Sequence, residues 1–75
     1  MKAYHRVTDV RFEGQFLHLT IDGEPKVFPL REISLALSRA AEHERQLFEV
    51  SPSGYGIHWP LLDEDLSIDG LLMVC

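Results

Sequence analysis

The sequence contains little that could reinforce a small protein covalently or with a metal. Cys75 is the only cysteine, so no disulfide can form within the chain. The four histidines are scattered and do not make a Cys/His set of the kind that holds structural zinc. At 75 residues, a core alone rarely supplies more than about 3–5 kcal/mol. We therefore expect self-association, most simply a homodimer, and expect Cys75 to be a bystander.

Positive charge and long apolar runs are also scarce. The 7 Lys and Arg residues against 12 Asp and Glu residues give a net charge of −5, which repels phosphate backbones and anionic lipid heads. This argues against direct nucleic-acid binding by this chain. No apolar run approaches the roughly 18 residues of a membrane span, and the first residues do not resemble a signal peptide. We expect one cytoplasmic domain over residues 1–75, without membrane contact.

The first part of the sequence has the pattern of short strands. Polar and apolar residues alternate over 8–12, with Thr8 and the other even-numbered residues on one face, and alternate again over 16–21. Asp22-Gly23 is a two-residue hairpin signal, because both turn positions favour positive φ. Residues 24–29 form the returning strand, and Pro25 there predicts an edge strand or a strand start.

After Pro29 the pattern changes to that of a helix. Ser34 is its expected N-cap. Glu44 interrupts the apolar stripe, which predicts that the helix ends near His43, and Leu35 falls on the polar face. The apolar stripe itself consists of Ile33, Ala36, Leu37, Ala40, Ala41, Leu47 and Phe48.

A second hairpin is expected from residues 48–51 and 55–59, joined by a turn at residues 52–54, with Tyr55 on the same face as Ile57 and Trp59. After Pro60 and the acidic run, Ser67 caps one last helical turn that has Asp69 in its first turn.

The fold class is thus α+β: a small antiparallel sheet made of a meander and a second hairpin, one helix, and a short C-terminal helical turn. The predicted core contains Leu17, Leu19, Leu37, Ala40, Ile57 and Trp59.

Two features could carry chemistry. Asp63, Glu64 and Asp65 could hold Mg²⁺ or Ca²⁺, but adjacent residues of an extended chain point in alternate directions and no calcium loop surrounds them. We interpret the run as a cap and turn. His58 could act as an acid or base if a carboxylate lies within reach, but a His58–Asp pair that orients the acidic run is the simpler interpretation. There is no phosphate loop or nucleophile elbow, so we expect no enzyme, no cofactor and no metal.

The second half of the chain resembles a bacterial family known as domain of unknown function 2442. The resemblance rests on a Gly-x-Ile-His-Trp-Pro segment, an Asp-Glu-Asp segment and a closing Gly-Leu-Leu. The residues that carry it, and that have possible functional or structural weight, are Gly56, Ile57, His58, Trp59, Pro60, Asp63, Glu64, Asp65, Ser67, Gly70, Leu71 and Leu72. The resemblance implies an α+β fold. It also implies a gene pair with another small protein, in an arrangement that resembles toxin–antitoxin pairs.

Two functional classes follow. The first is a small acidic protein–protein interaction or regulatory module, such as the antitoxin-like half of a two-gene pair whose partner is a small basic protein encoded nearby. The alternative is a small metal- or ligand-dependent enzyme subunit that uses His58 and the run from Asp63 to Asp65.

Overall fold

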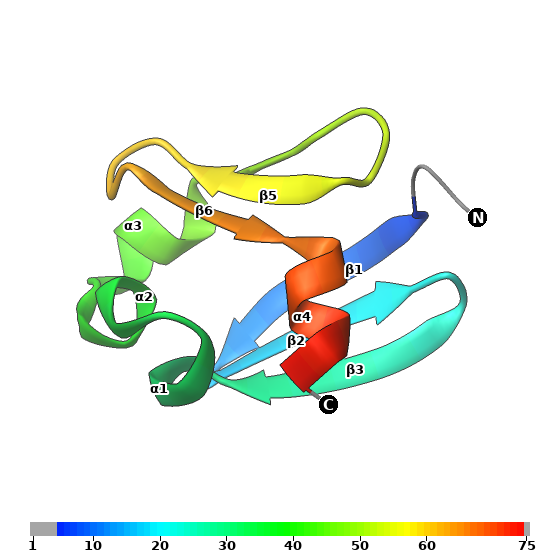
Figure 1. Cartoon of the computed structure of the whole chain (residues 1–75). Coiled ribbons are helices and arrows are strands. Elements are labelled where there is room, and N and C mark those ends of the chain that lie inside the picture. The colour runs from blue at the N-terminus through cyan, green and yellow to red at the C-terminus, as the bar shows by residue number, and fades with distance from the viewer. Residues whose placement is uncertain (1–4, 75) are drawn as a thin grey trace.

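The computed structural model describes residues 5–74, so Cys75 and its expected role lie outside the described residues. Within this range the chain runs through three strands, three short helices, three strands and a final helix (Figure 1). The strands are β1 (Val7–Glu13), β2 (Phe16–Ile21), β3 (Glu24–Pro29), β4 (Glu49–Val50), β5 (Gly56–Trp59) and β6 (Glu64–Ser67). The helices are α1 (Leu30–Ile33), α2 (Leu35–Arg39), α3 (Glu42–Gln46) and α4 (Ile68–Val74). The α+β class is therefore confirmed.

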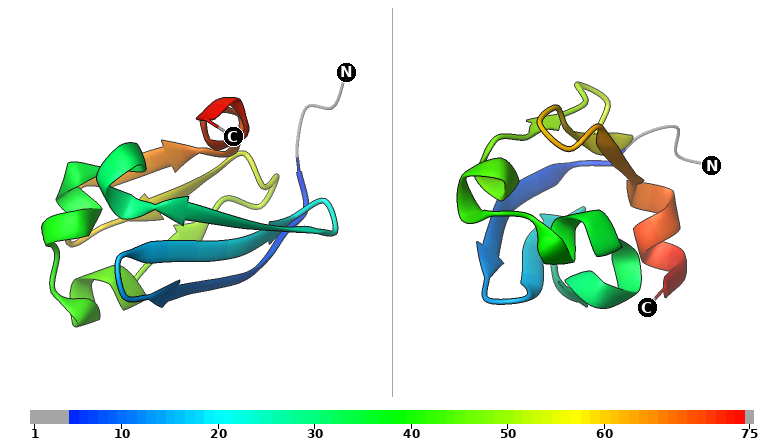
Figure 2. Two further views of the ribbon diagram at one scale, coloured as in Figure 1. Left: turned by 90° about the horizontal axis from the view of Figure 1, so that it is seen from below. Right: turned by 90° about the vertical axis from the view of Figure 1, so that its left-hand side faces the viewer.

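The strands form two antiparallel sheets, β1-β2-β3 and β4-β5-β6, where the sequence suggested one. The sheets lie on opposite sides of the core (Figure 2), α1 to α3 gather at one end, and α4 runs from the end of β6 toward β3. No helix in the described part of the chain is long and apolar enough to cross a membrane.

The core lies between the sheets and has a contribution from nearly every element. Of the six predicted core residues, five are buried and Ala40 is only half-buried. Trp59 fills the centre, with Phe12 and Phe48 each 6.2 Å from its ring centroid, and its Nε1 donates to the backbone oxygen of Arg45 at 3.0 Å. The full set of buried apolar residues is Leu17, Leu19, Ile21, Phe28, Leu30, Leu37, Ile57, Trp59, Ile68 and Leu71.

The first hairpins confirm the turn prediction and correct one strand. Asp22 and Gly23 have φ of 52° and 85°, as the hairpin requires, and Pro25 lies in the edge strand β3. In β1, however, the pairing with β2 shifts by one residue between Thr8 and Arg11, where Asp9 has φ of 54°. This bulge changes the alternation, so that Thr8 is exposed and Val7 packs against the core in its place.

The single predicted helix is replaced by three short ones. Ser34 does cap α2, since its hydroxyl accepts from the backbone N–H of Leu37 at 3.1 Å. The helix then stops at Ala40, because the Arg45 side chain donates to the oxygens of Leu37 and Ser38 at 2.9 and 3.1 Å and so satisfies carbonyls at the end of α2. The apolar stripe therefore does not face the core as one surface, and Ala36, Ala41 and Leu47 are exposed.

Glu44, which interrupted the stripe, has a role at the start of α3. Its Oε1 accepts the backbone N–H of Ala41 at 2.8 Å, as the Glu of a capping box does. The helical chain thus does not end near His43, which lies inside α3. Leu35 is exposed, as its place on the polar face predicted.

The second hairpin becomes a three-stranded sheet because the acidic run does not simply turn the chain. Asp63 lies in the turn with φ of 50°, whereas Glu64 to Ser67 form β6 and pair with β5. Tyr55 precedes β5 and is 60% exposed, so its predicted place beside Ile57 and Trp59 is wrong. The physical reason is the loop before it, in which Gly54 has positive φ and the Ser51 hydroxyl accepts the N–H of Tyr55.

Candidate functional site

The outer face of the β4-β5-β6 sheet carries two rows of side chains. Directly paired residues of antiparallel strands share a face, so the register places Glu49, His58 and Asp65 in one row across the three strands. The next row consists of small residues: Gly56 pairs with Ser67, and Ser51 donates its N–H to the oxygen of Gly56 at 3.0 Å. The row of charged and polar side chains therefore lies next to a row of glycine and serine residues, whose small side chains leave space above the sheet.

This arrangement leaves a hollow of about 410 Å³, which we call the outer groove. Its volume lies within the range of small-ligand sites, roughly 300–1,000 Å³. Tyr55 and Pro52 line it together with the two rows, and no Lys or Arg is among the lining residues. The residues of the groove are Glu49, Val50, Ser51, Pro52, Tyr55, Gly56, Ile57, His58, Asp65, Leu66 and Ser67.

The predicted His58–Asp pair is present in the groove. Nδ1 of His58 lies 2.7 Å from Oδ1 of Asp65, the residue directly opposite on β6. The side chains are 40% and 75% exposed, so the contact is a surface pair. Because the carboxylate holds one ring nitrogen, the imidazole is fixed with its other edge directed away from Asp65, which suits hydrogen bonding to a ligand.

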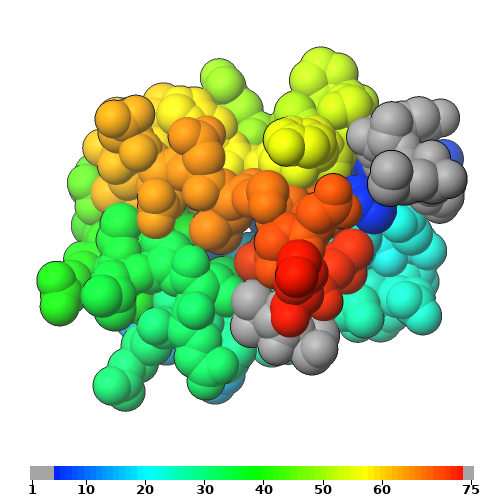
Figure 3. Space-filling view, viewed as in Figure 1, coloured from blue at the N-terminus to red at the C-terminus, as the bar shows by residue number. Residues whose placement is uncertain are grey.

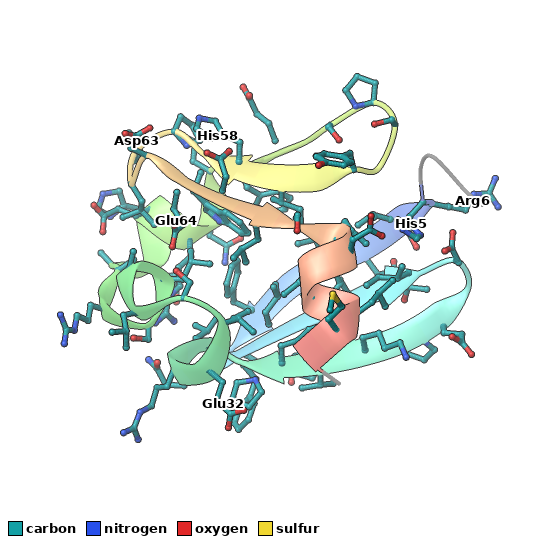
Figure 4. The ribbon with its side chains drawn as sticks, viewed as in Figure 1. His5, Arg6, Glu32, His58, Asp63 and Glu64 are labelled. Carbon is teal, nitrogen blue, oxygen red and sulfur yellow. The ribbon has the colours of Figure 1, made fainter. Side chains whose placement is uncertain are left out.

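The three carboxylates of the acidic run do not act as one unit. The pairing of β6 with β5 places Asp65 on the outer face and Glu64 on the inner face. Asp63 stays in the turn, and its side chain lies apart from that of Glu64 (Figure 4). Glu64 accepts a hydrogen bond from the Ser34 hydroxyl and so ties β6 to the start of α2. Among the described residues, no three His, Cys, Asp or Glu side chains are arranged so that they could hold a metal ion. One residue of the run, Asp63, therefore lies in a turn and the other two lie in β6, so the interpretation of the whole run as a cap and turn is wrong.

The other motif residues have mainly structural positions. Ile57 and Trp59 are buried, and Pro60 begins the turn that leads to β6. Ser67 caps α4 as predicted, because its hydroxyl accepts the N–H of Gly70 at 2.9 Å. In α4, Leu71 is buried and Leu72 is half-buried.

A smaller hollow of about 240 Å³ lies between Glu32, Leu66 and Leu71, on the side of the molecule that Figure 3 shows.

A cluster around His5 was missed by sequence reasoning. The two ring nitrogens lie 2.7 Å from Asp22 Oδ2 and 2.8 Å from Asp69 Oδ1, and the side chain is only 13% exposed. The His5 backbone N–H also donates to the oxygen of Ser53 at 3.0 Å. The start of the chain is thereby joined to the β2–β3 turn, to α4 and to the loop before β5. The partners stand 17 and 64 residues away in the sequence, so no local pattern could indicate them.

The geometry around His5 favours the protonated ring. A neutral imidazole has one N–H, whereas two carboxylates at its two nitrogens require two donors. The hydrogen bonds to Asp22 and to Asp69 accordingly raise the pKa of His5 above its ordinary value of 6.5. Asp22 and Asp69 are the charged groups that contact the ring among the described residues.

We expect the protein to lose stability as the pH rises through the pKa of folded His5. The raised pKa means that the contribution is complete below about pH 6.5 and is lost above the folded value. The denaturant concentration at the midpoint of unfolding should decrease between about pH 6 and about pH 9, and this decrease should be smaller in Asp69→Asn. An NMR titration of the His5 ring provides the direct check. A midpoint at or below 6.5 would contradict the assignment.

The charge is distributed unevenly along the chain, and the sequence itself shows which part of the chain carries the net negative charge. All seven Lys and Arg residues lie at or before Arg45, where they balance seven carboxylates. The remaining five carboxylates follow Arg45, so residues 46–75 account for the whole net charge of −5. Of these five, Glu49, Asp63 and Asp65 are exposed on or beside the β4-β5-β6 sheet. The outer groove is therefore on the acidic side of the molecule.

The comparisons with known proteins agree with this architecture. A crystal structure of a protein of unknown function from Rhodospirillum rubrum is similar, with a TM-score of 0.75 and 27% identity over 93% of this chain and 87% of that one. No curated protein matches the chain. The model of the family described as "Protein of unknown function (DUF2442)" matches residues 7–75. The chain therefore belongs to the DUF2442 family.

Proposed function

We propose that this protein is a small acidic interaction module that binds a basic segment of another protein on the outer face of the β4-β5-β6 sheet. The observation that carries the proposal is the position of a hollow of about 410 Å³ on the part of the chain that holds the entire net charge. Complementary charge steers a basic partner to this face and orients it there. The apolar lining of the groove then supplies area that a binding partner can bury.

The partner class we propose is a small basic protein encoded nearby, which this chain would neutralise as the antitoxin-like half of a two-gene pair. The acidic charge supports this class, because RNA-directed proteins are basic and this chain repels RNA itself. We place the pair in the cytoplasm. A homodimer remains compatible with it, since Phe16 and Val27 are 46% and 52% exposed on the other sheet and leave the outer groove free.

The test is a charge reversal in the groove. Glu49→Lys should abolish co-purification of the stoichiometric partner from the native host, as measured by mass spectrometry. Glu24→Lys is the matched control, because Glu24 is an exposed glutamate on β3 of the opposite sheet. It should retain the partner. Equal retention by both variants would contradict the proposed surface, and circular dichroism of both variants establishes that they are folded.

The enzyme alternative rests on the His58–Asp65 pair. An imidazole oriented by a carboxylate beside a groove is an arrangement that can transfer a proton. Glu64 and Asp63 point elsewhere, so this alternative reduces to a ligand-dependent reaction at the pair. A small molecule that co-purifies with wild-type protein and is lost in His58→Gln would favour it over the interaction module.

A further inference from the structure

The outer groove has two chemically different ends. The strip of small residues lies beside apolar lining from Pro52 and Tyr55, whereas the adjacent row ends in the carboxylates of Glu49 and Asp65. Alternate residues of one strand are about 6.5–7 Å apart, so the two rows are separated by the length of a side chain. A ligand that fits both ends is apolar along its stem and cationic at its tip.

The two carboxylates differ in availability. Asp65 is already held by Nδ1 of His58 at 2.7 Å. Glu49 is exposed, and its carboxylate makes no hydrogen bond or ion pair with any residue that the structure describes. Glu49 lies on β4, which like β6 is an edge strand, so a partner segment can approach it without displacing another strand. The carboxylate best placed to receive a cation is therefore Glu49.

We infer that the groove takes one arginine side chain of the partner, with its guanidinium at Glu49 and against the ring of Tyr55. This inference rests on the proposed function and specifies its ligand. Arginine fits better than lysine because its planar cation stacks on aromatic rings, pairs with a carboxylate through two N–H groups and is less strongly hydrated than an ammonium. Its methylene stem covers the apolar lining. The exposed ring of Tyr55 at the groove, 60% accessible, is then a contact surface.

The test uses a short blocked peptide in which one arginine stands among glycines and serines. Titration into ¹⁵N-labelled protein should give saturable shifts at Gly56, His58 and Ser67. The same peptide with citrulline, the neutral isostere of arginine, should bind about two- to fivefold more weakly, and Glu49→Gln should weaken the arginine peptide to a similar extent. Tyr55→Ala should also weaken it, Tyr55→Phe should restore binding, and Glu24→Gln should leave it unchanged.

Each outcome decides the inference. Equal binding of the arginine and citrulline peptides, or shifts located outside the groove, would overturn it. So would unchanged affinity in Glu49→Gln. A lysine peptide that binds more tightly than the arginine peptide would also reject arginine as the ligand. If the arginine peptide does not bind while Glu49→Lys still loses the natural partner, this inference fails and the interaction module stands. If the partner is retained by Glu49→Lys, the proposed function itself fails.

Discussion

Replacing Trp59 with alanine is expected to unfold most of the protein at room temperature. Trp59 is fully buried, and Phe12 and Phe48 pack against its ring from β1 and from the segment before β4. Removing a buried tryptophan costs about 3–5 kcal/mol, which is close to the total that a core of this size supplies. Circular dichroism and denaturant titration should therefore show little or no cooperative unfolding transition.

Two variants make this result specific. Tyr55→Ala removes an exposed aromatic side chain just before β5 and should change the free energy of unfolding by less than about 0.5 kcal/mol. Trp59→Phe keeps much of the apolar contact but removes the indole donor to the Arg45 oxygen, so about 1–3 kcal/mol should be lost. A Trp59→Ala protein with a melting curve near that of the wild type would show that the core is elsewhere.

Gly54→Ala is expected to be the most damaging of the glycine substitutions that we compare. Gly54 has φ of +69°, and an added Cβ would lie 1.6 Å from the backbone oxygen of His5. The backbone conformation costs roughly 1–2 kcal/mol for a residue with a Cβ, and relieving such an overlap adds about 1–3 kcal/mol. Because His5 also contacts Asp22, Asp69 and the backbone oxygen of Ser53, the displacement would loosen three attachments together.

Gly23→Ala separates the two costs. Gly23 has φ of +85°, but an added Cβ there meets no atom within 4 Å. It should therefore show the backbone cost alone, and the difference between the two melting temperatures measures the overlap with His5. For a chain of this size, each 1 kcal/mol shifts the midpoint by about 4–8 °C. Equal shifts in the two variants would mean that the loop before β5 moves freely away from the start of the chain.

Local signals predicted the parts of the fold that local chemistry determines. The Asp22-Gly23 turn, the Ser34 and Ser67 caps and the buried face of β2 each depend on residues within a few positions of one another. The division of the helix could not be predicted in this way. It depends on Arg45, which reaches back 7 and 8 residues to carbonyls of α2 and 31 residues to the oxygen of Gly14.

The same limit applies to β6 and to the site. An inward-facing strand position is expected to be apolar, but Glu64 occupies one because Ser34 on a distant segment bonds its carboxylate. A pair between His58 and an aspartate of the acidic run was predicted because the run follows His58 within seven positions, whereas the choice of Asp65 depends on the pairing of β5 with β6. The outer groove was not predicted, because it requires the register of three strands, and the His5 cluster requires contacts across most of the chain.

The separation of a neutral and a negative part of the chain gives the molecule an electric dipole moment. The principal extents of the molecule are 35 × 22 × 18 Å. The longest of them is several times the Debye length, which is about 8 Å at physiological ionic strength. A basic molecule that comes within about one Debye length of the surface is oriented with its positive charge toward the β4-β5-β6 sheet before any contact forms. Its association rate constant should therefore fall steeply with added salt, while its dissociation rate constant, which depends on the contacts in the groove, should change far less.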